Sequence, residues 1–105
     1  MLPWILLLLA GLLEVVWAAS LKASDGFSHT GYAVLTGISA AASFWLLGLA
    51  MRDLPLGTAY PVWVGIGAVG AVIFGIVWFG DPATPLRLAA IGMILGGVAL
   101  LKVAG

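Results

Sequence analysis

The sequence contains no cysteine, and His29 is its only histidine. Without cysteine the chain forms neither a disulfide nor a thiolate metal site, and one histidine is too few for a metal centre. We therefore expect no metal and no cofactor. Charged residues are also scarce, at 8% of the chain, and they form no basic or acidic tract. A nucleic-acid partner is therefore not expected.

What the chain does contain is apolar. Hydrophobic residues make up 64% of it, and the mean hydropathy is +1.25. A soluble domain is about half apolar and about one quarter charged, because its surface must be covered with polar groups. The composition therefore indicates a membrane protein that lies in a lipid bilayer.

Four long apolar runs, at about 2–22, 31–51, 57–79 and 84–102, are separated by short polar breaks. Each run reaches the ~20 residues that a helix needs to cross ~30 Å of hydrocarbon. Backbone hydrogen bonds must close within a segment in lipid, so each run is predicted to be a helix. The short breaks force neighbouring helices to run antiparallel. We predict an all-α integral membrane protein in which residues 1–105 form a single four-helix domain.

Basic residues are divided equally between the two sides of these predicted spans. Lys22 and Arg87 border one side, and Arg52 and Lys102 border the other. An excess of lysine and arginine normally fixes which side faces the cytoplasm, but here the count is two against two. Either the bias is weak by chance or the chain inserts in both orientations.

Glu14 is the acidic residue that interrupts the first apolar run. A carboxylate near the centre of a membrane helix costs ~2.5–3.5 kcal/mol and usually faces a partner or a water-filled cavity. No basic residue lies deep inside any run, so a proton or a cationic ligand is the natural counter-charge. The alternative is a protonated glutamate that hydrogen-bonds a neighbouring helix.

Four further side chains are candidates for the same site. Trp17 lies three residues after Glu14, so its indole N–H can reach the carboxylate. Tyr60 and Trp63 share one helix face, and aromatic faces suit an organic cation, although core packing explains the same spacing. Ser43 is a weaker candidate, because a buried serine most often bonds the backbone of its own helix.

The glycines of the last two runs fall into two groups. Gly65 and Gly67 lie in the middle of the third run, where glycine weakens a helix and permits bending. We predict a conformational hinge there. Gly92 and Gly96 form a small-xxx-small pair in the fourth run, which permits close contact between helices. We expect this pair to lie in a dimer interface.

The sequence around these residues resembles the small multidrug resistance transporters. The resemblance covers the whole chain. Its carriers, which are highly specific together, are the segments 11–18, 21–22, 26–27, 54–60 and 65–67, with Trp63. Within the family the chain is most similar to the guanidinium-exporter subtype, chiefly through Trp17, where the polyaromatic-drug subtype typically has a small residue. One departure is Pro61, which replaces the alanine usually found there.

The resemblance implies an antiparallel, dual-topology homodimer in the bacterial cytoplasmic (inner) membrane. It also implies that the protein is not an enzyme but a proton-coupled antiporter, exporting guanidinium and small guanidinyl cations. Glu14 would bind the proton and the cation in turn. Four residues match the hydrogen-bonding ring around that carboxylate: Trp17, Ser43, Tyr60 and Trp63.

Pro61 makes the breadth of substrates depend on where the third helix begins. If it begins at Thr58, Pro61 removes nothing, because amides of the first turn lack helical partners. If it begins at Leu54 or Pro55, Pro61 opens the helix wall beside Tyr60. The site would then tolerate alkyl-substituted guanidinium or small quaternary ammonium cations. Two alternatives remain, a quaternary ammonium exporter of the same family and a structural or pore-forming membrane subunit.

Overall fold

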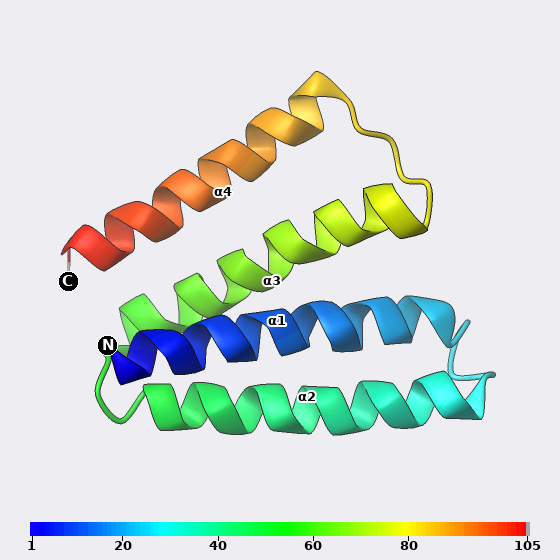
Figure 1. Cartoon of the computed structure of the whole chain (residues 1–105), viewed down its shortest axis with the longest axis horizontal. Coiled ribbons are helices and arrows are strands. Elements are labelled where there is room, and N and C mark those ends of the chain that lie inside the picture. Colours follow the sequence, from blue (N-terminus) through cyan, green and yellow to red (C-terminus); the bar gives the residue numbers. More distant parts are fainter. Residues whose placement is uncertain (105) are drawn as a thin grey trace.

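A computed structural model describes residues 1–104 of the chain as four helices joined by short connections (Figure 1). Helix α1 spans Leu2–Ala23, α2 spans Thr30–Ala50, α3 spans Leu56–Trp78 and α4 spans Pro85–Ala104. All four are long and apolar enough to cross a membrane. Their ends differ from the ranges expected from the apolar runs by at most two residues.

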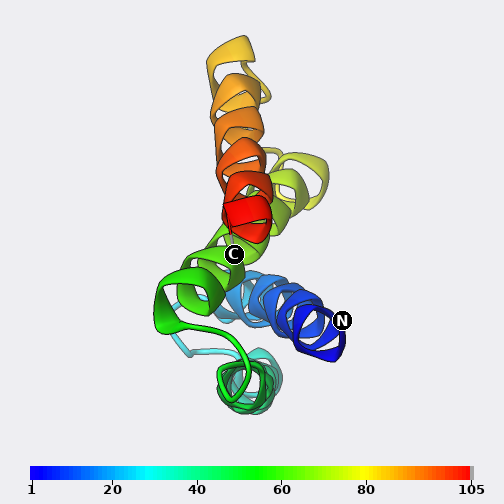
Figure 2. The ribbon, with the colours of Figure 1, turned by 90° about the vertical axis from the view of Figure 1, so that its left-hand side faces the viewer.

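The helices are spread out instead of closing into a compact bundle (Figures 1 and 2). Helix α1 packs most extensively against α2 and next against α3, whereas the backbone of α4 approaches only that of α3. The molecule measures 41 × 34 × 17 Å. Packed helices lie ~8–10 Å apart, so the shortest dimension corresponds to about two helix layers. The helices of residues 1–104 therefore form no ring around a passage.

Two glycines let α3 approach its neighbours closely. A Cβ atom at Gly11 of α1 would lie 2.7 Å from the Cβ atom of Ile66, and one at Gly65 would lie 2.6 Å from Cγ2 of Val98 in α4. Only glycine fits at such contacts, as is common between membrane helices. Helix α3 is continuous through this region, so Gly65 has a packing role, and its role as a hinge stays a prediction.

The buried core lies where α1, α2 and α3 meet. Its members are mostly small or aliphatic, with one aromatic ring among them: Leu7, Ala10, Leu47, Ala50, Ala59, Val62 and Trp63. The core includes a residue that the sequence had assigned to a binding site, namely Trp63, which is only 5% exposed. Trp63 therefore supports the packing of the three helices.

Helix α4 supplies no member of this core, although Val98 and Leu101 pack against its edge. Ile91 is the one residue of α4 that is buried among those the structure describes. A Cβ atom at Gly92 or Gly96 would meet nothing within 4 Å. The small-residue surface predicted for a dimer interface is therefore open, and either lipid or another helix can cover it.

Candidate functional site

Glu14 lies on a groove of about 400 Å³ between α1, α2 and α3. Three of the four side chains that the sequence grouped with it line the same groove, namely Trp17, Tyr60 and Trp63. The remaining lining residues are Phe44, Leu47 and Val64. The helices therefore bring together side chains that are up to 50 positions apart in the chain.

The carboxylate of Glu14 lies directly against the backbone of α3 at Gly67. A Cβ atom at Gly67 would be 2.8 Å from the Cβ atom of Glu14 and closer still to its carboxylate. Any larger residue at position 67 would therefore displace the carboxylate or push α3 away from α1. The sequence assigned Gly67 to a hinge, but the structure gives it a further role as the contact surface for Glu14.

Two polar atoms of this groove are buried and have no hydrogen-bond partner among the residues that the structure describes. They are Oε1 of Glu14, an acceptor, and Nε1 of Trp17, a donor. Leaving a buried polar group unpaired costs ~1–3 kcal/mol, so such groups are rare in native proteins. An unpaired acceptor and donor on one groove are typical of a site that binds a polar ligand.

Ser43 is placed beneath the groove, where it connects two helices to Trp63. Its Oγ donates a hydrogen bond to the carbonyl oxygen of Ala10 in α1 at 2.7 Å. The same Oγ accepts a hydrogen bond from Nε1 of Trp63 in α3 at 3.0 Å. By contrast, Ser39 bonds the carbonyl oxygen of Leu35 in its own helix at 2.6 Å. A bond to the backbone of its own helix, the common arrangement for a buried serine, is thus made by Ser39 and not by Ser43. Ser43 instead positions the indole of Trp63.

Three aromatic rings form a continuous wall of the groove. The ring of Trp63 lies 5.6 Å from that of Tyr60 and 5.6 Å from that of Phe44, with the planes tilted by 48° and 58°. Tyr60 and Phe44 are about half exposed, at 50% and 54%. Sequence reasoning missed Phe44, because an aromatic residue in an apolar helix gives the same signal whether it faces lipid or a ligand.

This arrangement has the chemistry of a site for an organic cation. One carboxylate supplies negative charge, the aromatic faces attract a cation through their π electrons, and no basic side chain lines the groove. Among residues 1–104 no group of three or more histidine, cysteine or acidic residues could hold a metal ion. The fold and the groove together define a membrane protein with a carboxylate and aromatic rings on one groove between its first three helices.

Comparison with known proteins agrees with that description. Residues 2–94 match the sequence profile of the family described as Small Multidrug Resistance protein. The chain therefore belongs to the small multidrug resistance family. This membership confirms the predicted resemblance, the all-helical architecture with four membrane spans, and the expectation of a transport protein instead of an enzyme.

Curated relatives extend over nearly the whole chain. The protein is 52% identical over 101 residues to the "Guanidinium exporter" of Yersinia pestis, which covers 96% of this chain and 97% of the relative. It is 54% identical over 99 residues to the "Guanidinium exporter" of Escherichia coli strain K12, covering 94% of both. The "Guanidinium exporter" of Salmonella typhi is 52% identical over 99 residues, again covering 94% of both. All three relatives are bacterial.

Replacing Ser43 tests whether it holds Trp63 in place. We expect Ser43→Ala to lower the free energy of unfolding by about 1–2 kcal/mol, because it leaves the indole N–H of Trp63 buried without a partner. Ser39→Ala is the matched control, since Ser39 is equally buried and bonds only its own helix. Unfolding in detergent micelles by added SDS measures both. In a Trp63→Phe background the cost of Ser43→Ala should shrink. Equal losses for the two serine variants would contradict the assignment.

Proposed function

We propose that the protein is a proton-coupled antiporter that exports guanidinium and small guanidinyl cations across the bacterial inner membrane. The observation that carries the proposal is Glu14, a membrane-buried carboxylate with an unpaired oxygen on a groove that contains no basic side chain. The relatives that match almost the entire chain at 52–54% identity are named guanidinium exporters, which supports the same substrate.

The hydrogen-bonding character of the groove favours guanidinium over a quaternary ammonium ion. Guanidinium is planar and presents parallel N–H donors that pair with a carboxylate through two hydrogen bonds. Its flat face also stacks on aromatic rings such as those of Tyr60 and Trp63. A quaternary ammonium ion has no N–H to offer the Glu14 oxygen, although the aromatic wall would still attract it. An exporter of such ions is therefore the second candidate.

Competition for one carboxylate explains how transport is coupled to protons. A proton bound to Glu14 removes the negative charge that holds the cation, and a bound cation stabilises the ionised form against the proton. The two therefore exclude each other, so protons that move inward displace cations that leave on the other side. Intramembrane carboxylates serve as proton relays in other transporters for the same reason.

The other site residues have distinct parts in this proposal. The unpaired indole N–H of Trp17 and the hydroxyl of Tyr60 line the groove with Glu14, and we assign them to orienting the carboxylate and the cation. Trp63 supplies an aromatic face, and Ser43 acts through Trp63 as a positioning residue. Bending of α3 at Gly65 and Gly67 would alternately open the groove to either side.

We further propose that two copies of the chain assemble as an antiparallel homodimer. One subunit has no enclosing ring of helices, and the face of α4 that contains Gly92 and Gly96 is uncovered. Two copies in opposite orientations would form an inverted repeat, the arrangement by which many transporters obtain equivalent inward and outward states. The equal division of lysine and arginine between the two sides permits both orientations.

Pro61 gives this chain a local feature that bears on its substrate range. Helix α3 begins at Leu56, after the N-cap Pro55, so Pro61 lies inside the helix and not in its first turn. Proline has no amide N–H, and the carbonyl of Gly57 one turn earlier therefore lacks its helical partner. Pro61 is exposed next to Tyr60, so we expect this part of α3 to be less rigid. The groove beside Tyr60 should then accept alkyl-substituted guanidinium or small quaternary ammonium ions.

Removing the charge of Glu14 tests the function directly. Glu14→Gln should abolish the exchange of protons for guanidinium, because the amide neither binds a proton nor pairs with a cation. Reconstituted liposomes with an imposed pH gradient and labelled guanidinium provide the measurement. Glu14→Asp is the control, since it keeps the carboxylate and should keep proton-driven transport at a reduced rate. Proton-driven accumulation by Glu14→Gln would exclude the proposed role.

Dual topology can be tested with a single cysteine, because the natural chain has none. We expect His29→Cys, in the exposed connection between α1 and α2, to react with a membrane-impermeant maleimide from both sides of the membrane. Two lysines added to that connection should confine labelling to one side and lower activity. A copy biased in the opposite direction should restore it. Labelling of the starting variant from one side only would rule out the antiparallel dimer.

Replacing Pro61 tests its influence on selectivity. Pro61→Ala supplies the missing amide to the carbonyl of Gly57, so the wall beside Tyr60 should become firmer. We expect transport of alkyl-substituted guanidinium and small quaternary ammonium ions to fall several-fold relative to guanidinium, which should be transported nearly as before. Substrate-induced currents across a membrane that contains only this protein would compare the cations. An unchanged ratio between bulky and small cations would show that Pro61 does not set the range.

A further inference from the structure

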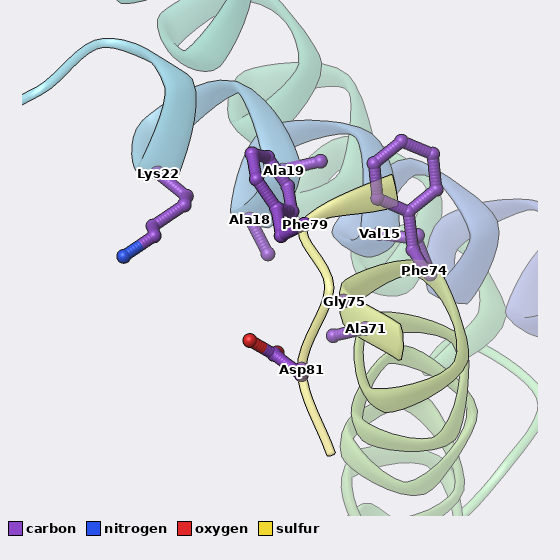
Figure 3. A pocket seen from close by; sticks show the side chains of 9 residues that line it. All are labelled: Val15, Ala18, Ala19, Lys22, Ala71, Phe74, Gly75, Phe79 and Asp81. Atoms are coloured by element: carbon purple, nitrogen blue, oxygen red, sulfur yellow. The ribbon is translucent and has the colours of Figure 1, made fainter. Parts of the chain in front are cut away.

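A second pocket, of about 260 Å³, lies apart from the Glu14 groove, between the C-terminal ends of α1 and α3 (Figure 3). Small side chains and two phenyl rings make up most of its lining. Two charged residues also line it, Lys22 from the last turns of α1 and Asp81 from the segment that follows α3. None of the roles proposed above uses this pocket.

Asp81 is held at the pocket by the way α3 ends. Gly80 has a positive φ of 75°, which turns the chain back so that the backbone N–H of Asp81 donates to the carbonyl oxygen of Gly75 at 3.0 Å. This is the usual glycine termination of a helix. The turn brings the carboxylate against Gly75, where a Cβ atom would lie 3.3 Å from Cγ of Asp81 and closer still to one oxygen. The negative charge therefore has a defined place at the pocket.

The pocket repeats the chemistry of the Glu14 groove on a smaller scale. The rings of Phe74 and Phe79 line it, and Phe74 meets Phe79 edge to face at 5.9 Å between centroids. A carboxylate together with aromatic faces attracts a planar cation. The pocket differs from the Glu14 groove in having a basic residue, Lys22. Figure 3 shows the ammonium group of Lys22 on the same open side as the carboxylate of Asp81.

Two rows of side chains, each with a spacing of four residues, connect this pocket with the Glu14 groove. Residues four apart lie above one another on one face of a helix. The row in α1 consists of Glu14, Ala18 and Lys22, and the row in α3 consists of Gly67, Ala71 and Gly75. Glu14 touches the first glycine of the α3 row and Asp81 touches the last. Eight residues of helix rise by ~12 Å, so small side chains line the α1–α3 contact from one carboxylate to the other.

We propose that this pocket is an outer binding station for the transported guanidinium cation. The carboxylate of Asp81 accepts hydrogen bonds from the cation before it reaches Glu14 or after it leaves, and the ammonium of Lys22 competes with the cation for that carboxylate. In an antiparallel dimer, one such station lies at each surface of the membrane. The inference rests on the proposed guanidinium export.

The test is the KM for guanidinium, measured in liposomes under a fixed pH gradient. Both charges are exposed, and exposed ion pairs are weak and screened by salt. We therefore expect Asp81→Asn to raise the KM about two- to fivefold at low salt, with little change in the maximal rate. Asp25→Asn is the matched control, because it removes the same charge from the same end of the molecule, outside the pocket. Its positive φ of 48° is one that asparagine tolerates.

Lys22→Gln supplies an independent test with the opposite sign. It should lower the KM by a similar factor, because the competing ammonium is gone, and it should have no effect in the Asp81→Asn background. A changed membrane orientation would alter the amount of active protein and hence the maximal rate, not the KM. Asp81→Glu keeps the charge, so its KM should stay near that of the natural protein and shows that the turn tolerates substitution.

Several results would overturn the station. These are an equal KM for Asp81→Asn and Asp25→Asn, additive effects of the Lys22 and Asp81 substitutions, or differences that persist unchanged in high salt. If the natural protein does not exchange guanidinium for protons at all, the proposed function itself fails, and the station fails with it. If the natural protein transports guanidinium normally and Asp81→Asn has the same KM, only the proposed station is excluded.

Discussion

The structure depends on a carboxylate that is buried in a membrane helix without a basic partner. Lipid does not solvate that charge, so the protein must supply a proton, a ligand or polar neighbours to accommodate it. The neighbours of Glu14 do this only in part: Gly67 gives it room, and one of its oxygens is unpaired among the described residues. This incomplete pairing is the basis of our proposal that a proton and a cation occupy the site in turn, and antiport would follow from their competition.

The helices differ in what they contribute to the surroundings of this carboxylate. Helices α1, α2 and α3 share the buried core and the groove. Two hydrogen bonds fix their register, one from Ser43 to the carbonyl oxygen of Ala10 and one from the indole of Trp63 to Ser43. Helix α4 touches that core only through partly buried side chains such as Val98 and Leu101, and its face with Gly92 and Gly96 is open. This arrangement is compatible with the proposed homodimer, in which the groove and the open face of α4 would have separate roles.

Much of this could be predicted from the sequence, because residue type and helical spacing determine it. Four apolar runs were enough to locate the helices to within two residues at each end. Glu14 stood out since a charge in such a run is costly, and the three-residue spacings placed Trp17 on the same groove and Tyr60 beside Trp63. The expected hydrogen bond from the indole of Trp17 to the carboxylate does not form, because Nε1 of Trp17 has no partner among the described residues. These features are local to one helix, so periodicity suffices to find them.

The remainder depends on how helices meet, which spacing within one helix does not reveal. The bond from Ser43 to α1 requires the register between α1 and α2, and the contact of Gly67 with Glu14 requires the distance between α1 and α3. Phe44 gave no signal, because an aromatic residue in an apolar helix is equally compatible with lipid and with a ligand. The position of Pro61 within α3 depended on a start site that the sequence limited only to a few residues.

The most direct test of the central claim is whether guanidinium and a proton share Glu14. Purified protein in detergent and weak buffer would be titrated with guanidinium while a pH indicator records proton release. The account predicts that binding releases protons, that the amount changes with pH, and that the Glu14→Gln variant releases none. Guanidinium binding without proton release at any pH would contradict it.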